Sequence, residues 1–132
     1  MTRRATILIL NQSPSQLELD PESTKLRRGK LKDGDESEVP DVIPPGGHIV
    51  LRCKSTGFPH SIEGSMTCRL EGHAPHDSVR FTWRSCYLLP NAYNAETSRE
   101  GYKVEVEGGG GARAVVLFVF SKYDDAHFCT SA

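Results

Sequence analysis

The chain has 132 residues, which is enough for one domain whose buried core needs no disulfide or metal to hold it together. Its 16 Lys and Arg residues and 17 Asp and Glu residues give a net charge of −1. No global basic field therefore attracts nucleic acid or anionic lipid, and we expect no nucleic-acid partner. We expect a single domain over residues 1–123 and a frayed tail over residues 124–132.

The N-terminal segment differs from an export signal. Arg3 and Arg4 precede an apolar run at residues 5–10, but this run is shorter than the hydrophobic region of a signal peptide, and Asn11 ends it. No later segment has the ~18 consecutive apolar residues that cross a bilayer. We therefore expect a soluble protein without a signal peptide, either cytoplasmic or secreted by a non-classical route.

Short alternating segments separated by turn residues fill the first half of the chain. Strands are predicted at residues 6–10, at 16–19, around Leu26 and Leu31, at 48–53 and at 65–70. Residues 11–15 and the Pro-Gly sequence at 44–46 supply turns. Glu63 is an isolated acidic residue at the junction of a loop with the strand at 65–70, a position where binding residues are frequent.

The second half continues the same pattern. Strands are predicted at residues 78–84, with Val79, Phe81 and Trp83 on one face, and at 102–106. Residues 87–93 are expected to form an irregular apolar loop and residues 94–100 a polar segment. Four glycines at 108–111 form a flexible reversal before residues 114–120, which are apolar on both faces and therefore predict a strand in the middle of a sheet. With no helical stripe, the chain predicts an all-β, antiparallel β-sandwich of roughly seven to nine strands.

Cysteines and histidines give little indication of metal or redox chemistry. The cysteines lack a C-x-x-C spacing, and Cys53, Cys68 and Cys86 are expected to act as small buried hydrophobes beside strands. A disulfide between Cys53 and Cys86 can form if the protein meets an oxidising compartment. His73 and His76 are expected to be surface residues rather than metal ligands, so we expect no metal and no other cofactor.

The sequence contains none of the motifs typical of the common enzyme classes. It has no G-x-S-x-G elbow, no P-loop and no H-E-x-x-H motif. The acidic residues at 33–38 are expected to lie in a solvated loop rather than to form a catalytic carboxylate pair. We expect no catalytic residues and no enzymatic activity.

Large apolar side chains in a predicted loop are a stronger signal. Tyr87, Leu88, Leu89 and Tyr93 surround a Pro-Asn pair that interrupts any strand. Exposed rings and aliphatic side chains near basic residues are typical of proteins that settle into a membrane interface. The alternative is that they fold back as a lid over the end of the core.

The order and spacing of these elements resemble those of the aegerolysins from about residue 6 to residue 122. Residues 26–31 (LRRGKL) are similar to the family's L-x-W-G-K-F element, and residues 33–46 resemble its acidic loop and I-x-P-G turn. Residues 61–70 (SIEGSMTCRL) resemble its G-T-E-G-x-F-D-L motif. Residues 81–86 (FTWRSC) stand where the family has an aromatic-rich strand that ends in D-C-P-W. The small component of binary insecticidal proteins from bacilli shares this resemblance.

The resemblance implies a non-enzymatic β-sandwich that binds sphingolipids or sterol-rich domains peripherally at target membranes. It also implies that the chain is a toxin component, the recruiting half of a two-component cytolysin. Such a protein takes part in hemolysis together with a larger pore-forming partner. In this family Glu63 would discriminate the lipid headgroup, and residues 87–93 would contact headgroups and the interface. Arg28 replaces the tryptophan of W-G-K, and no lysine follows in the loop, so the sequence departs from the family at two of its lipid contacts.

The candidate lipid-binding residues divide into three roles. Four side chains insert shallowly into the interface, and Glu63 accepts hydrogen bonds from a headgroup amine or hydroxyl. Basic side chains approach lipid phosphates. The complete set is Glu63, Tyr87, Leu88, Leu89, Tyr93, Trp83, Arg28, Lys30 and Arg84.

Two other functions fit the same sequence. One is a glycan- or protein-binding effector or lectin-like module without membrane activity, in which Trp83 and Tyr87 stack on a ligand ring. The other is an intracellular structural protein whose apolar loop forms the interface of a homo-oligomer.

Overall fold

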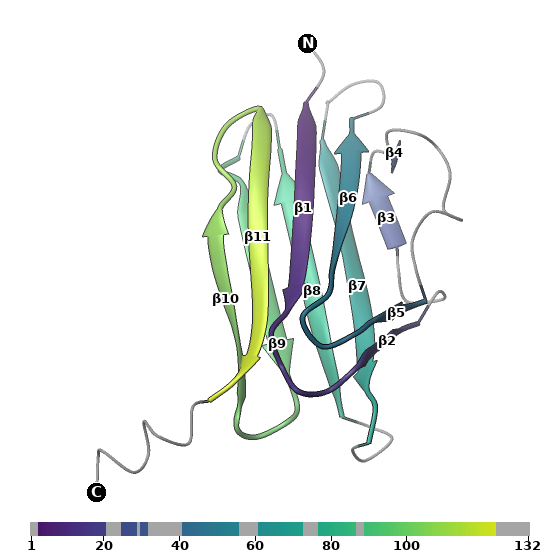
Figure 1. Ribbon diagram of the computed structural model, residues 1–132. Helices are drawn as coiled ribbons and strands as arrows, with labels where there is room; N and C mark the ends of the chain where they lie inside the picture. Colours follow the sequence, from purple (N-terminus) through teal and green to yellow (C-terminus); the bar gives the residue numbers. More distant parts are fainter. Residues whose placement is uncertain are drawn as a thin grey trace, which may run out of the picture.

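The computed structural model describes residues 3–20, 25–28, 30–31, 41–55, 61–72, 77–86 and 89–123, of which 25–28 and 30–31 are described by their backbone alone. The described chain folds into two β-sheets packed face to face (Figure 1). None of the described residues forms a helix with the length and apolar character that a bilayer crossing requires.

The first sheet, sheet A, contains both the first and the last strand of the described chain, β1 and β11. Its order is β10 (Tyr102–Gly108), β11 (Arg113–Lys122), β1 (Arg4–Asn11), β6 (His48–Lys54) and β4 (Lys30–Leu31). The central pair, β1 and β11, is parallel, and the other pairs are antiparallel.

The second sheet, sheet B, is antiparallel throughout. Its order is β5 (Val42–Ile43), β2 (Leu17–Leu19), β7 (Ile62–Leu70), β8 (Ser78–Ser85) and β9 (Ala92–Thr97), and β3 (Lys25–Arg28) also pairs with β7. The two sheets confirm the predicted all-β sandwich.

The hydrophobic core lies between the sheets because each long strand alternates between buried and partly exposed residues. Sheet A contributes side chains such as Ile7 and Phe118, and sheet B contributes side chains such as Met66 and Phe81. The rings of Phe81 and Phe118 meet edge to face across the layers, with centroids 5.3 Å apart. The period of two in the sequence therefore corresponds to one buried face per strand.

The two ends of the sandwich differ, and we name them for what they contain. The turn end holds the connection from β1 to β2, which carries the chain from sheet A to sheet B. The loop end holds the start of β1, the end of β8, the start of β9 and the connection from β10 to β11; it is the upper end in Figure 1.

Asn11 organises the turn end through its fully buried side chain. Its Nδ2 donates to the backbone oxygens of Ser15 (2.8 Å) and Ile43 (3.0 Å), and its Oδ1 accepts from the backbone N (3.1 Å) and Oγ (2.6 Å) of Ser13. These bonds join the end of β1 to the segments before β2 and within β5. The turn predicted at residues 11–15 is thus a hydrogen-bonded crossover between the sheets.

Two strand boundaries differ from the sequence prediction. β7 begins at Ile62, so Glu63 lies inside a strand rather than at a loop-to-strand junction. Residues 92–97 form β9, although they were assigned to an irregular loop and a polar segment. β9 is an edge strand of sheet B, with polar residues on its exposed face, and this composition obscured the alternation.

Candidate functional site

The described candidate residues gather at the loop end, on the outer face of sheet B and beside a pocket. On sheet B, Glu63 is paired with Arg84 of β8 and with the backbone position of Arg28 on β3. The neighbouring residues Ile62 and Ser85 are buried, so Glu63 and Arg84 project outward. Strand pairing thus brings three of the predicted positions into one row.

Arg84 is only partly exposed within this row. Its Nε is buried and has no hydrogen-bond partner in the described part of the chain. An unsatisfied buried donor costs about 1–3 kcal/mol. An acceptor brought to this face by a ligand would therefore be stabilising.

Trp83 is not part of a surface site, which corrects its assignment as a lipid-contact or ring-stacking residue. Its side chain is 1% exposed and belongs to the core. Gly64 lies directly across from it on β7, where a Cβ atom would come within 2.7 Å of the indole. The glycine after Glu63 therefore makes room for a buried tryptophan, and the indole cannot stack on a ligand from solution.

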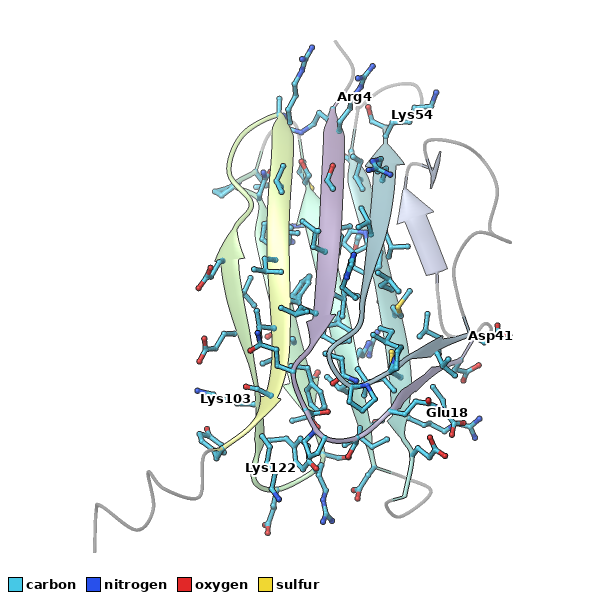
Figure 2. All side chains as sticks on the ribbon, viewed as in Figure 1. Arg4, Glu18, Asp41, Lys54, Lys103 and Lys122 are labelled. Carbon is cyan, nitrogen blue, oxygen red and sulfur yellow. The ribbon has the colours of Figure 1, made fainter. Side chains whose placement is uncertain are left out.

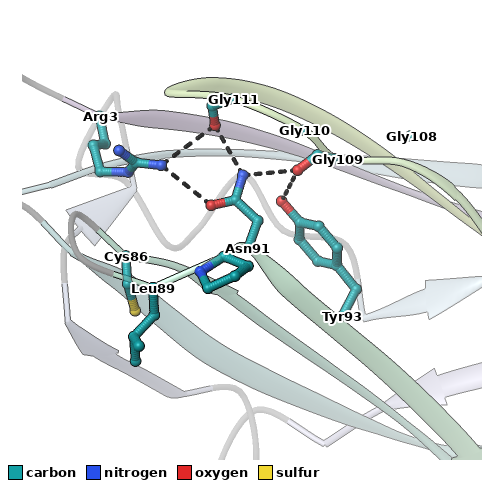
Figure 3. A pocket seen from close by; sticks show the side chains of 10 residues that line it. Arg3, Cys86, Leu89, Asn91, Tyr93, Gly108, Gly109, Gly110 and Gly111 are labelled. Atoms are coloured by element: carbon teal, nitrogen blue, oxygen red, sulfur yellow. Dashed lines mark hydrogen bonds between the residues drawn. The ribbon is translucent and has the colours of Figure 1, made fainter.

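A pocket of about 500 Å³ opens at the loop end (Figure 3). Its walls come from the segment before β1, the segment between β8 and β9, and the connection from β10 to β11. The lining residues are Arg3, Cys86, Leu89, Pro90, Asn91, Tyr93, Gly108, Gly109, Gly110 and Gly111.

Arg3 forms one wall of the pocket and is fixed at both backbone and side chain. Its backbone exchanges hydrogen bonds with Ser55, from Arg3 N to Ser55 Oγ (3.0 Å) and from Ser55 N to Arg3 O (3.0 Å). Its Nε donates to Ser85 Oγ (3.1 Å), and its Nη2 donates to Asn91 Oδ1 (3.2 Å) and Gly111 O (3.5 Å). Within the described residues Nη1 makes no hydrogen bond, so one donor group of this half-buried cation is available to a ligand.

Asn91 and Tyr93 hold the glycine-rich connection on the opposite wall. Asn91 Nδ2 donates to the backbone oxygens of Gly109 and Gly111, both at 2.8 Å, and the Tyr93 hydroxyl donates to Gly109 O at 2.8 Å (Figure 3). The turn predicted to be flexible is thus held by three hydrogen bonds, two from Asn91, directly before β9, and one from Tyr93 of β9.

Replacing Gly109 by any other residue would strain the backbone and cause a steric overlap. Its φ is 96°, in the region that side chains rarely adopt, and a Cβ atom would overlap the Tyr93 ring. Gly110, its neighbour, has no atom near the position of a Cβ. The glycine run therefore has a specific structural requirement at Gly109 rather than a general need for flexibility.

Tyr93 is half-buried on β9, not in an irregular loop. Its ring meets Phe118 edge to face, with centroids 6.4 Å apart. Burial raises the pKa of the Tyr93 phenol, and the hydrogen bond with Asn91 and the charge of Arg3 partly offset that rise. The phenol is therefore neutral at physiological pH and remains the donor to Gly109.

Leu89 lies at the edge of the pocket with 56% of its surface exposed. It is the member of the predicted interfacial set that the structure shows at the surface; Tyr87 and Leu88 lie outside the described residues. The structure thus leaves Leu89 accessible to a partner, and its role as an apolar contact stays a prediction.

The cysteines do not form the disulfide considered from the sequence. Cys53, Cys68 and Cys86 are free thiols. Burial raises the pKa of Cys53 and of Cys68 to about 12, so both thiols stay protonated. Among the described residues no three His, Cys, Asp or Glu side chains are placed to hold a metal ion.

No local sequence pattern predicts that Arg3, Asn91 and Gly109 line a pocket. Arg3 was considered only as a flank of an apolar segment, and Asn91 only as an interruption of a strand. Gly109 was one of four similar glycines. The side-chain contacts of Arg3 join residues 82–108 positions apart in the chain, and Asn91 and Gly109 are 18 positions apart, so local spacing carries no signal of these contacts.

Solved structures of other proteins share the fold. The crystal structure of RahU protein in complex with a Tris molecule matches 93% of this chain and 97% of that chain, with a TM-score of 0.66 and 13% identity. The crystal structure of the lipid-binding protein Nakanori matches 91% of this chain and 71% of that chain, with a TM-score of 0.72 and 10% identity. No protein-family model and no curated protein matches the sequence. The structural matches show an aegerolysin-like fold, as the sequence resemblance implied.

Proposed function

We propose that this chain, with its aegerolysin-like fold, is a non-enzymatic protein that binds a membrane-lipid headgroup at its loop end. The observation that carries the proposal is a pocket of about 500 Å³, with Arg3 in its wall and Leu89 exposed at its edge. A cation that can reach a phosphate and an apolar side chain that can reach acyl chains are the two groups that a peripheral lipid site needs.

The hydrogen bonds of the pocket indicate how a headgroup would bind. The carbonyl oxygens of Gly109 and Gly111 each already accept two hydrogen bonds, whereas Arg3 Nη1 donates to none of the described acceptors. An anionic oxygen is therefore the preferred ligand of the pocket, and the lone pairs of the Tyr93 hydroxyl and Asn91 Oδ1 are the places for an amine or hydroxyl.

The row on sheet B would supply a second contact. Arg84 precedes Ser85, which binds Arg3, and Arg84 is paired with Ala92, which follows Asn91. The row thus adjoins the pocket, and Glu63 would accept hydrogen bonds from a headgroup while Arg84 approaches a phosphate. Arg28 and Lys30 keep their predicted role as phosphate contacts.

Leu89 would insert into the interface. Burying the exposed part of one leucine stabilises binding by about 1–2 kcal/mol, which is too little for tight binding alone. We infer that Tyr87 and Leu88 add to this contact, and that several molecules act together on one membrane.

Two solved structures with a similar fold support the proposal of a lipid ligand. Nakanori is described as a lipid-binding protein, and RahU was solved with Tris, a hydroxylated amine. We propose a sphingolipid or a sterol-rich domain as the target, and recruitment of a larger pore-forming protein as a second step. In that case the chain alone binds membranes without lysing them.

Co-sedimentation with vesicles tests the proposal. The vesicles contain phosphatidylcholine alone, sphingomyelin with cholesterol, or ceramide phosphoethanolamine in phosphatidylcholine. We expect binding to at least one of the sphingolipid vesicles that exceeds binding to phosphatidylcholine. Arg3→Gln and Leu89→Ser should each weaken it by about tenfold, equivalent to about 1.4 kcal/mol.

Matched controls separate this site from the rest of the surface. Val42→Ser removes an apolar side chain that is 39% exposed on β5, and Arg80→Gln removes an exposed cation from the middle of β8. Both should bind like the unmodified protein. Failure to bind any vesicle, or equal losses in the controls, would overturn the proposal.

A further inference from the structure

The outer face of sheet A carries an aliphatic surface that the proposed lipid site does not use. Strand pairing places Leu117 of β11 beside Leu8 of β1, and Leu8 beside Val50 of β6. The next row on the same face pairs Val119 with Leu10. We call these residues, together with Val115, the aliphatic face.

The aliphatic face is open among the described strands. Val115 is 56% exposed, and the other members are partly exposed. Figure 1 shows β11, β1 and β6 side by side at the front, with no described strand laid over them. A sandwich normally directs polar residues outward, and contiguous apolar surface marks an interaction site.

The two edges of this face carry opposite charges. On β10, Glu105 and Glu107 project outward and are exposed; Glu105 forms an ion pair with Lys103 of the same strand (2.7 Å), which leaves Glu107 as the acidic group that can pair with another chain. On β6, Arg52 is exposed and Lys54 is partly exposed, and Figure 2 shows Lys54 beside Arg4 at the loop end of the strands. An acidic edge and a basic edge therefore flank an apolar centre.

We propose that the aliphatic face is the interface between two copies of this chain. A two-fold interface must be complementary to itself. A two-fold axis parallel to the strands, between β11 and β1, exchanges β11 with β1 and β10 with β6. It therefore brings the acidic edge of each copy against the basic edge of the other.

The pairing register supports this axis in detail. Glu107 is in the row of Leu117, Leu8 and Val50, and Arg52 is two residues beyond Val50 on the same face. That separation is about 6.6 Å along a strand, within reach of an arginine side chain. Glu107 of one copy thus faces Arg52 of the other, and the contact occurs twice.

The same charges argue against a membrane as the occupant of this face. An anionic bilayer would attract Arg52 and repel Glu107, whereas a second copy places these two opposite charges together. The axis also leaves the loop ends of both copies on the same side. If the proposed lipid site is correct, the dimer would present two such sites to one membrane.

Sedimentation equilibrium without lipid tests the interface over micromolar to millimolar concentrations. We expect a concentration-dependent dimer of the 14.6 kDa chain. Glu107→Arg and Arg52→Glu should each weaken dimerisation by about tenfold or more, because each places like charges opposite one another twice. An equimolar mixture of the two variants should restore it, because both contacts of the mixed dimer then join opposite charges.

Controls keep the test independent of folding and of lipid binding. Arg80→Glu changes an exposed arginine on sheet B and should leave dimerisation unchanged. Near-ultraviolet circular dichroism, which reports on buried Trp83, confirms that each variant is folded. A chain that is monomeric throughout, or a mixture that stays as weak as its components, would overturn the interface whatever the vesicle assays give.

Discussion

The two ends of the sandwich use similar side chains in different ways. At the turn end, Asn11 is fully buried, and its side chain makes four hydrogen bonds that join sheet A to sheet B. At the loop end, the hydrogen bonds of Arg3, Asn91 and Tyr93 are partly buried and surround an open pocket, with Leu89 exposed beside it.

This difference separates stability from binding. A fully buried polar network must be satisfied for the chain to fold, so the turn end specifies the crossover between the sheets. A partly buried network beside a pocket can accept a ligand without being dismantled. Substitutions at the turn end should therefore reduce stability and spare binding, and those at the loop end should affect binding more than stability.

The largest expected effect is the loss of the Asn11 side chain. Asn11→Ala leaves two carbonyl oxygens and the Ser13 donors without their partners, and should lower the free energy of unfolding by about 2–4 kcal/mol. Denaturant titration measures this value, with exposed Asn94→Ala as the control. Vesicle binding by the folded fraction should be unchanged, and a loss of binding at equal folded fraction would contradict the separation of the two ends.

A smaller loss is expected from Gly109→Ala. An alanine backbone is strained at a φ of 96°, and its Cβ atom would overlap the Tyr93 ring. The variant should therefore lose about 1–3 kcal/mol of the free energy of unfolding, and its pocket wall should be displaced. Gly110→Ala is the matched control because open space surrounds its Cβ position. Equal stability and equal vesicle binding in both variants would show that the connection does not shape the site.

The smallest expected effect is that of Tyr93→Phe, which removes the hydrogen bond to Gly109 and should cost about 0.5–1.5 kcal/mol near neutral pH. Burial raises the phenol pKa above that of the unfolded chain. The contribution of the neutral phenol is therefore present below about pH 10 and is lost as the pH rises through the folded-state pKa. Denaturant titrations from neutral to alkaline pH measure the free energy of unfolding of the unmodified protein and of Tyr93→Phe. The two values should converge as the pH rises, and a difference that grows with pH would contradict this assignment.

Much of the fold could be predicted because alternation is a local property. The sequence around Phe81 places apolar side chains on one face, and the structure buries them. The same rule failed for β9, because an edge strand exposes one face to water and buries only part of the other. Residues 114–120 are apolar on both faces, which places β11 between two neighbours, yet its outer face is still open among the described strands.

The site was harder to predict because it depends on residues that are distant in the chain. Glu63 and Arg84 were identified from their motifs, and strand pairing brings them together. Trp83 belongs to the same motif but lies over Gly64 in the core, and alternation alone could have assigned it there. No local pattern connects Arg3 to Asn91, since the sheet topology creates that contact.

The most direct test of the lipid-binding proposal is an environment-sensitive fluorophore placed at either end of the sandwich. Leu89→Cys and Val42→Cys provide the attachment points, in a protein with Cys86 and Cys129 changed to serine. The buried thiols of Cys53 and Cys68 have pKa values of about 12 and should not react.

Adding sphingomyelin and cholesterol vesicles, or vesicles with ceramide phosphoethanolamine, should shift the emission of the label at position 89 to shorter wavelength and leave that at position 42 unchanged. This result would place the loop end against the membrane. A shift at position 42 alone, or no shift at either position with any of these vesicles, would contradict the account.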